Sequence, residues 1–202
     1  MPSPCPKPRT ITAVILAGGQ GSRMGGIDKG LVLFRNKPLI EHVLDTITPY
    51  VDNVLISANR SREQYERFGY PVLADSLPDY PGPLAGILTA LENSTAELLL
   101  AVPCDTPLLP SDLVVRLSNA LRSSGAEIAI PSDGTQLHAA ILLMEHSVTG
   151  ELRSYLRAGE RKVQSWLQRH RTVQVDFSDA PGAFANLNTL DELQELEQQH
   201  GH

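Results

Sequence analysis

The chain has 202 residues, of which 42% are hydrophobic, and this is enough for one domain with a substantial core. It contains no apolar run of membrane-spanning length, so we expect a soluble protein that does not act on a membrane. A formal net charge of −6 argues against general binding to nucleic acids.

The charge is distributed unevenly along the chain. The first 40 residues carry six Lys or Arg and one acid, Asp28, whereas the last 27 carry six acids and no Lys or Arg. A basic N-terminal region beside an acidic body suits a small anionic ligand that binds locally. The acidic C-terminal stretch is typical of a solvated helix face.

The N-terminus has no apolar signal region. We predict a disordered tail over residues 1–9 and a single domain over residues 10–202. The two cysteines lie in different contexts, Cys5 in the tail and Cys104 after an apolar run. We therefore expect no disulfide, a packing role for Cys104, and a cytoplasmic location.

Apolar runs and helical periodicities alternate along the chain. Strands are predicted at residues 12–16, 31–34, 53–57, 71–74, 97–102, 126–131, 137–144 and 172–176. Helices are predicted at residues 38–48, 62–68, 84–92, 111–121, 148–156 and 161–167. Ser111 is the expected cap of the fourth helix, and Thr189 with Glu192 forms a capping box for a final one. This order predicts an α/β fold with a doubly wound, mostly parallel sheet, in which 126–131 and 137–144 form a hairpin-like pair.

Four residues stand at or just after the ends of predicted strands: Gly18, Ser57, Asp75 and Asp105. Because ligands of doubly wound sheets bind at the carboxyl ends of strands, we expect these residues to line one edge. Asp105 follows the most apolar strand, where a carboxylate is either paired structurally or holds a cation. Mg²⁺ typically binds one or two carboxylates together with substrate phosphates.

The stretch at residues 16–29 contains five glycines within nine residues. Such a loop brings backbone N–H groups close to an anion, Arg23 is suited to paired contacts with phosphate oxygens, and Lys29 adds a mobile charge. Asp28 either caps a turn or orients Lys29. The stretch is neither a Walker A loop, because Gly30 follows Lys29, nor a dinucleotide fingerprint, because Met24 occupies its last glycine position.

The pattern L-A-G-G-x-x-x-R-M-G-x-x-x-K at residues 16–29 resembles the signature of nucleotidyltransferases that couple an NTP to a phosphorylated acceptor. Four later blocks, at residues 79–86, 103–107, 155–161 and 184–189, resemble the molybdenum cofactor guanylyltransferase (MobA) family in the order that this family has them. The resemblance covers nearly the whole chain. It implies a three-layer, Rossmann-like nucleotidyltransferase fold and the transfer of GMP from GTP to molybdenum-molybdopterin, with release of pyrophosphate.

The resemblance also implies roles for particular residues. Arg23, Lys29 and Mg²⁺ held by Asp105 would neutralise charge while the acceptor phosphate attacks the α-phosphate in line. The residues implied in GTP binding are Leu16, Ala17, Gly18, Gly19, Lys29, Ser57, Asp75, Gly82 and Asp105. Asn186 and Asn188 would face the same way in an extended stretch and are candidates for the acceptor or the metal, or are turn asparagines. Transient contacts with the molybdenum insertion enzyme and with molybdoenzymes or their chaperones are implied by the family.

Some positions depart from the family pattern or have ordinary alternatives. Ser57 stands where the family often has Asn, so that contact is lost, bridged by water or passed to Asn59. His138 is followed by Ala139 and Ala140, where relatives more often read His-Pro-Thr. This departure weakens the case for a pterin contact and favours a structural role for His138. Three basic residues either meet the acceptor's anionic groups or form a solvated helix face: Arg157, Arg161 and Lys162.

Two other functions remain open from the sequence. The first is an enzyme of different specificity, either a cytidylyltransferase for the same pterin or a sugar-phosphate nucleotidyltransferase. Gly18 stands where the cytidylyl relatives have Ala and so favours a larger purine. The second is a non-catalytic nucleotide-binding or carrier module, against which the joint presence of Arg23, Lys29 and Asp105 argues.

Overall fold

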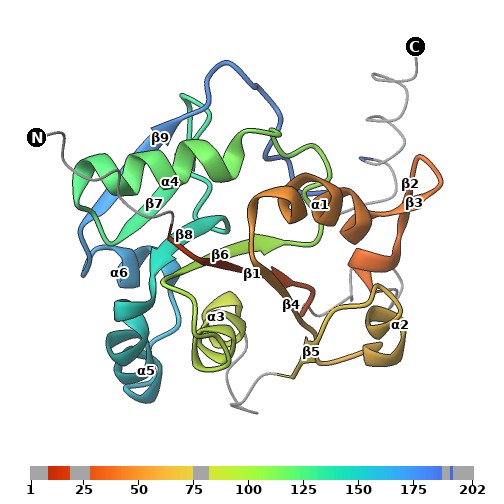
Figure 1. The fold of residues 1–202 in the computed structure, drawn as a ribbon, viewed down its shortest axis with the longest axis horizontal. Coiled ribbons are helices and arrows are strands. Elements are labelled where there is room, and N and C mark those ends of the chain that lie inside the picture. The colour runs from red at the N-terminus through yellow and green to blue at the C-terminus, as the bar shows by residue number, and fades with distance from the viewer. Residues whose placement is uncertain (1–8, 19–27, 75–81, 188–191, 193–202) are drawn as a thin grey trace, which may run out of the picture.

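A seven-stranded sheet with helices on both faces forms the protein in a computed structural model that describes residues 9–18, 28–74, 82–187 and 192 (Figure 1). The strand order is β5-β4-β1-β6-β8-β7-β9. The strands are β1 (Ile11–Leu16), β4 (Asn53–Ser57), β5 (Val72–Leu73), β6 (Leu98–Pro103), β7 (Ile128–Ser132), β8 (Leu142–Glu145) and β9 (Thr172–Asp176). Only β8 runs antiparallel to its neighbours, β6 and β7, so the sheet is mostly parallel as predicted.

Two apolar clusters fill the space between the sheet and its helices. The helices are α1 (Leu39–Ile47), α2 (Arg62–Glu66), α3 (Pro83–Glu92), α4 (Leu113–Ser124), α5 (Thr149–Arg157) and α6 (Val163–Leu167). Along β1, Ala13 and Ile15 belong to the cluster under α1 and α4, whereas Val14 belongs to the cluster with α3, α5 and α6. Successive side chains of a strand point to opposite faces, so these two clusters define three layers. The predicted three-layer, doubly wound fold is confirmed.

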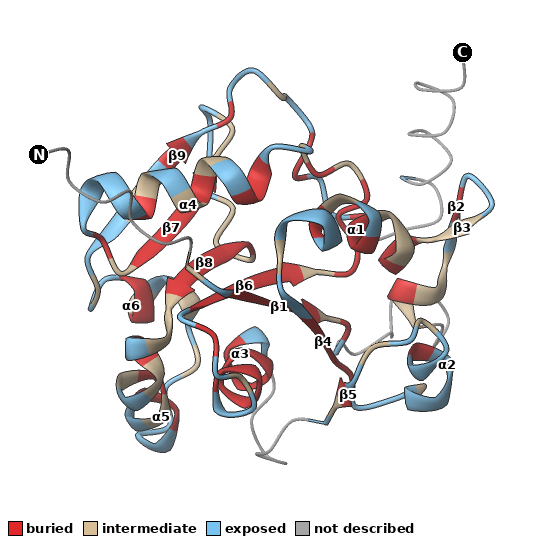
Figure 2. Cartoon of the chain, viewed as in Figure 1, coloured by how far each residue is buried: buried red, intermediate tan, exposed pale blue. Residues whose placement is uncertain are grey.

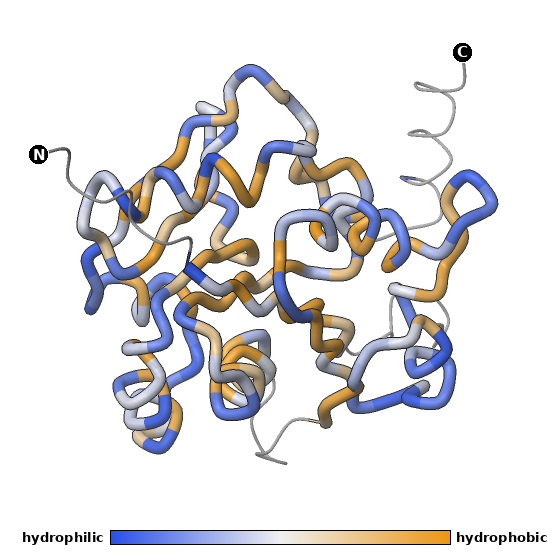
Figure 3. The backbone as a smooth tube through the Cα atoms, viewed as in Figure 1, coloured by the Kyte–Doolittle hydropathy of each residue, from blue (hydrophilic) through white to orange (hydrophobic). Residues whose placement is uncertain are grey.

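The longest apolar runs in the sequence form elements that are covered by other parts of the protein on both faces. In β6, residues 98–102 are at most 2% exposed, because helices cover both faces of the strand. Helix α3 has no charged residue before Glu92, and its residues 84–91 are all buried between the sheet and α5 (Figure 2). Hydrophobic residues concentrate on the central strands, whereas the tip of the β2–β3 hairpin is hydrophilic (Figure 3).

The segment that follows the glycine-rich stretch differs from its prediction as a strand over 31–34. A 3₁₀ turn, η2 (Lys29–Leu31), precedes a short hairpin of β2 (Leu33–Phe34) and β3 (Lys37–Pro38). Its turn residues Arg35 and Asn36 have φ angles of 51° and 59°, the left-handed geometry of tight hairpins. Helix α1, predicted over residues 38–48, begins at Leu39 after Pro38.

The prediction of a strand over residues 137–144 is wrong in its first half. Only β8 is a strand, because residues 133–141 form a loop whose backbone and side chains bond to Asp133 and to Pro131. The antiparallel pairing of this strand with β7 is confirmed. A single bridge, Ser132 to Leu137, marks where the predicted hairpin was expected to close.

Three further expectations concern helix ends and membrane spans. Ser111 is not the cap of α4, which begins at Leu113 with Asp112 before it and no side-chain cap bond. The predicted final helix and Thr189 lie outside the described residues, apart from Glu192. In the described ranges, no helix combines the length and apolar character needed to cross a bilayer.

Candidate active site

The carboxyl ends of the three central parallel strands meet at one level. Leu16 at the end of β1 is in register with Ser57 of β4 and with Pro103 of β6. The Ala17 N–H donates to the Ser57 carbonyl at 2.9 Å, and the Cys104 N–H donates to the Leu16 carbonyl at 3.1 Å. The segments that leave these strands therefore form one edge, where ligands of such sheets bind.

Lys29 and Asp105 come together at this edge. The Lys29 Nζ lies 3.3 Å from Asp105 Oδ2, with the two side chains 24% and 12% exposed. Asp105, at 8% exposure, is the one charged side chain among the described residues that is buried. A carboxylate this deep requires a partner, and the ammonium group supplies one while both groups still reach solvent.

The turn that carries Lys29 is fixed by contacts with α2. The Tyr65 hydroxyl donates to Asp28 Oδ1, and Tyr65 itself is fully buried. Burial, followed by the proximity of the Cys104 thiol and the hydrogen bond to the Asp28 carboxylate, raises the pKa of Tyr65, so the hydroxyl stays protonated and remains a donor. Asp28 thus anchors the turn through Tyr65, and its side chain forms no cap bond to η2.

Gly30 is the point of closest approach in this turn. A Cβ at Gly30 would lie 2.6 Å from the Tyr65 hydroxyl and 3.3 Å from the Cys104 Cβ. Neither neighbour is the free end of a flexible chain, because Tyr65 is held by its ring packing and by Asp28. The residue after Lys29 is glycine because the turn lies directly on Tyr65.

We expect Gly30→Ala to lower both stability and activity, because the added methyl pushes the Lys29 turn away from Tyr65. Overpacking of this kind costs about 1–3 kcal/mol. Thermal unfolding measures the effect on stability, and an assay of the enzyme's turnover measures the effect on activity. Gly150→Ala is a matched control, since a Cβ at Gly150 meets nothing within 4 Å. Unchanged stability of Gly30→Ala would show that the turn is not held as described.

Ser57 lies at the predicted edge, but its side chain is buried between the sheet and α3. It is 4% exposed, and a Cβ added to Gly86 of α3 would lie 2.6 Å from its Oγ. Asn59, two residues on, is exposed, and its Nδ2 lies 3.9 Å from the point where a Gly18 Cβ would be. The side chain that reaches the edge near Gly18 is therefore Asn59.

Two glycines border the same edge. Gly18 is exposed, and a Cβ there would make only ordinary contacts, so packing within the described protein does not demand a glycine. Gly82 precedes α3 with a φ of 130°, a conformation that side chains rarely adopt, and Pro83 starts the helix. The N-terminus of α3, which follows β5 in the chain, thus faces the edge with its partial positive charge.

A segment near the C-terminus joins Asp105 from the other side. The Leu187 N–H donates to the Asp105 carbonyl at 3.0 Å, and the Leu187 side chain packs with Phe34 and Leu39. Asn186, directly before it, is exposed. The structure therefore brings Asn186 beside Asp105. Four other predicted site residues lie outside the described residues: Gly19, Arg23, Asp75 and Asn188.

Other candidates have structural roles. Cys104 is 5% exposed, and burial, followed by the nearby Asp105 charge, raises the pKa of its thiol, so it is a packing residue as expected. Arg161 donates to the Leu156 and Glu160 carbonyls at the end of α5. His138 bonds to Asp133 and lies in a loop rather than in the predicted strand.

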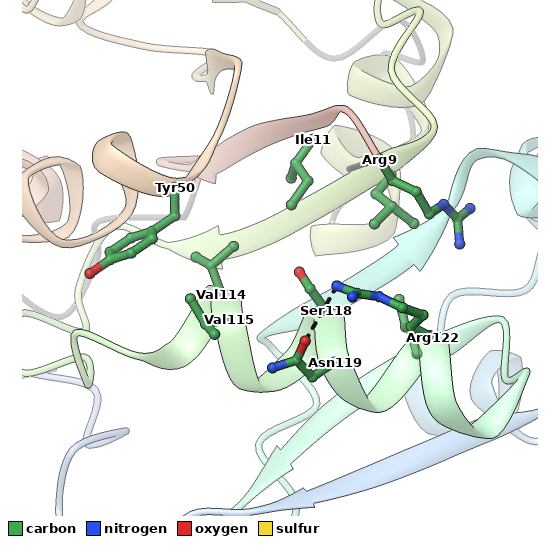
Figure 4. A pocket seen from close by; sticks show the side chains of 10 residues that line it. Arg9, Ile11, Tyr50, Val114, Val115, Ser118, Asn119 and Arg122 are labelled. Atoms are coloured by element: carbon green, nitrogen blue, oxygen red, sulfur yellow. Dashed lines mark hydrogen bonds between the residues drawn. The ribbon is translucent and has the colours of Figure 1, made fainter. Parts of the chain in front are cut away.

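A cavity of about 290 Å³ lies elsewhere (Figure 4). Its walls include Ile11 and Leu98, which begin β1 and β6, together with Tyr50 and the Val115 face of α4. It therefore opens at the amino ends of the strands, opposite the edge that carries Lys29 and Asp105. It is not the candidate active site.

Comparisons with known proteins show the family to which the chain belongs. The MobA-like NTP transferase domain family matches residues 13–174. A molybdenum cofactor guanylyltransferase of Shewanella loihica is 48% identical over 95% of this chain and 98% of its own length. Another from Ralstonia nicotianae is 48% identical over 92% of this chain and 95% of its own.

Solved structures show the same fold. Molybdopterin-guanine dinucleotide biosynthesis protein A from Archaeoglobus fulgidus superposes with a TM-score of 0.76 at 25% identity, over 95% of this chain and 99% of that one. A nucleotidyl transferase from Methanothermobacter thermautotrophicus gives 0.75 at 19% identity, over 94% of this chain and 97% of that one, which supports the fold alone. The chain therefore belongs to the MobA-like NTP transferase family, among the molybdenum cofactor guanylyltransferases, and is a nucleotidyltransferase enzyme.

Proposed function

We propose that this enzyme transfers GMP from GTP to molybdenum-molybdopterin, forming the guanine dinucleotide cofactor and pyrophosphate. The observation that carries the proposal is the Lys29–Asp105 pair at the carboxyl edge of the sheet, in which Lys29 ends the glycine-rich stretch and Asp105 follows β6. The naming of the curated relatives as molybdenum cofactor guanylyltransferases supports this choice of donor and acceptor.

The reaction needs positioning and charge neutralisation more than a protein base. The acceptor phosphate is already anionic, so its oxygen attacks the α-phosphorus of GTP without losing a proton, and the bond to the β-phosphate oxygen breaks as pyrophosphate leaves. Lys29, held by the η2 turn, and Arg23 would neutralise charge on the triphosphate. Leu187 fixes the Asp105 backbone and so holds Asn186 beside it, and we propose that Asn186 contacts the acceptor and marks the acceptor side of the site.

We propose Mg²⁺ as the metal and Asp105 as its protein ligand. Asp105 offers a hard carboxylate oxygen, and the parts of the chain that the structure describes contain no group of three His, Cys, Asp or Glu residues arranged as a cage. That donor set fits Mg²⁺, which keeps several waters and binds through one or two carboxylates plus substrate phosphates. When bound, the ion supplies positive charge at the phosphates.

The base would lie between the segment at residues 16–18 and Gly82. The Ala17 N–H is bonded to Ser57, so we assign the base contacts at residue 17 to the carbonyl. Gly18 has no side chain to limit the size of the base, and a Cβ there would make only ordinary contacts, so the site can accept a purine. We propose that Asn59 takes the place of the family's Asn at position 57. Gly19 and Asp75 complete the proposed guanosine site.

We expect pyrophosphate release with molybdopterin to prefer GTP over CTP, ATP and UTP. A site that hydrogen-bonds one base rejects others by about 10² or more in kcat/KM. Chelation of divalent metal should abolish release. Asn59→Ala should narrow the preference for GTP, whereas Ser57→Ala, in which the altered side chain faces α3, should leave it unchanged.

Each other result would assign a different function. Release with CTP in place of GTP would identify a cytidylyltransferase and overturn the interpretation of Gly18. Nucleotide binding without release from any nucleotide would identify a carrier module. We also propose that the enzyme works in the cytoplasm, where nucleoside triphosphates are available, with transient contacts to the molybdenum insertion enzyme and to recipient molybdoenzymes or their chaperones.

A further inference from the structure

The loops that follow β7 and β9 lie at the same edge as Asp105. β8 runs antiparallel to both β6 and β7, and β9 runs parallel to β7. Hence β6, β7 and β9 all end at the carboxyl edge of the sheet. Residues 133–141 and 177–187 leave the sheet there, beside the residues proposed for catalysis.

Asp133 organises the first of these loops. Its Oδ1 accepts the Thr135 N–H at 2.8 Å, the Thr135 hydroxyl at 2.6 Å and the Gln136 N–H at 2.9 Å. Its Oδ2 lies 2.8 Å from His138 Nε2. These bonds hold the pKa of Asp133 well below its usual range, because they stabilise the carboxylate. The bonds from Thr135 and Gln136 contribute more to this effect than the bond from His138. The carboxylate therefore remains ionised and fixes the His138 ring.

The His138 ring in turn packs on the second loop. It lies 4.7 Å from the Phe184 ring at an interplanar angle of 30°, and its side chain is only 13% exposed. Phe184 packs edge-on against Phe177 at 5.3 Å between ring centroids, and the Arg116 guanidinium lies 3.8 Å from the Phe177 ring centroid. Phe184 is thus held on one side by the core and on the other by His138.

Phe184 and Leu187 are the two buried anchors of a short segment, at 4% and 3% exposure. Ala185 and Asn186 between them are exposed. The Leu187 N–H bonds to the Asp105 carbonyl, so a shift of Phe184 would move Asn186 relative to Asp105.

We propose that His138 is a positioning residue for the acceptor side of the active site, acting through Phe184 on the segment at residues 184–187 that carries Asn186. This inference rests on the proposed guanylyl transfer. The proposal gives His138 no contact with the nucleotide or the metal, and its effect passes through Phe184. Its ring, oriented by Asp133, sets where the acceptor-facing segment lies.

The test measures KM and kcat for the acceptor, the dissociation constant of GTP, and thermal stability in His138 variants. His138→Ala should raise the acceptor KM by about tenfold, since small misplacements of positioning groups are costly, while GTP affinity stays within about twofold. His138→Phe keeps a ring against Phe184 and should restore most of the acceptor KM, although it loses the bond to Asp133.

His146→Ala is the matched control. The His146 ring bonds to the Leu91 and Ser94 carbonyls and follows β8 at the opposite edge of the sheet. It should lose stability with no change in acceptor KM. Gly134→Ala is a second perturbation of the same loop, because a Cβ there would lie 3.1 Å from the Ser178 Cβ. It should raise the acceptor KM as His138→Ala does, and it carries the test if His138→Ala does not fold.

The outcomes separate the inference from the function on which it rests. Wild-type protein that releases no pyrophosphate from GTP and molybdopterin would overturn the proposed function. Wild-type activity with an unchanged acceptor KM in His138→Ala, or in Gly134→Ala where His138→Ala does not fold, would overturn only the positioning role. Equal acceptor KM values in His138→Phe and His138→Ala would also overturn it, because the ring contact with Phe184 would then have no effect on acceptor binding.

Discussion

Asp105→Ala is expected to abolish pyrophosphate release while the protein stays folded. Removal of the carboxylate takes away the proposed metal ligand and leaves Lys29 without the partner that holds it at 3.3 Å. Loss of one preorganised charge contact of this kind costs about 3–4 kcal/mol of transition-state stabilisation, or about 10² to 10³ in kcat. Loss of the metal site would add to this. Steady-state kinetics over a range of Mg²⁺ concentrations is the measurement.

Asp45→Ala is the control for Asp105→Ala. Asp45 pairs with Lys37, but its side chain is 66% exposed, and such surface pairs contribute about 0–1 kcal/mol to stability. It should therefore leave activity and thermal stability close to the wild type. Asp105→Ala with kcat within tenfold of the wild type would remove Asp105 from the mechanism. If Asp105→Ala instead lowered the unfolding temperature so far that the variant was unfolded in the assay, the loss of activity would assign Asp105 a structural role.

The residues that the sequence placed best are those whose surroundings follow from the local pattern. Residues 98–102 form a continuous apolar run, and only a strand covered on both faces accommodates one in a doubly wound sheet. Asp105 follows from that strand, because the first polar position after a buried parallel strand lies at its carboxyl edge. The same argument places Ala17 and Gly18 after β1.

The features that could not be predicted from the local sequence depend on contacts between residues that are distant in the chain. The Lys29 turn is a 3₁₀ turn because Gly30 lies on Tyr65, which is 35 positions away in the chain. Ser57 turns inward because Gly86 of α3 leaves space for its hydroxyl. The loop at residues 133–141 takes the place of the first half of the strand predicted at 137–144, because the Asp133 side chain accepts N–H groups of the loop. An apolar pattern does not show such side-chain bonds.

The contacts of Asp105 and Lys29 also explain why the site tolerates a buried charge. Asp105 is held through its backbone by Leu187 and through its side chain by Lys29. The 3₁₀ turn that carries Lys29 is itself fixed by the hydrogen bond between Tyr65 and Asp28 and by the close packing of Gly30 on Tyr65. The two charges are thus preorganised before substrate arrives, which is the arrangement that lowers the reorganisation needed at the transition state.

Lys29→Ala is expected to lower kcat/KM for GTP by about 10² or more. The ammonium group would face the triphosphate oxygens, and its contact strengthens as negative charge develops on the leaving pyrophosphate. Lys29→Arg keeps the charge but not the compact point geometry, so it should recover only part of the activity. Lys37→Ala is the matched control, because Lys37 forms the exposed pair with Asp45 eight residues further along the chain. Kinetics with GTP and direct GTP binding are measured on all three variants.

The double variant Lys29→Ala with Asp105→Ala distinguishes a joint role from two separate ones. Groups that act as a unit give losses that do not add, so the double variant should be little worse than the more damaged single variant. If each residue acted alone, the two losses would multiply. Losses that multiply, with unchanged GTP binding in Lys29→Ala, would contradict a shared role at the triphosphate and would leave the ion pair as a structural contact only.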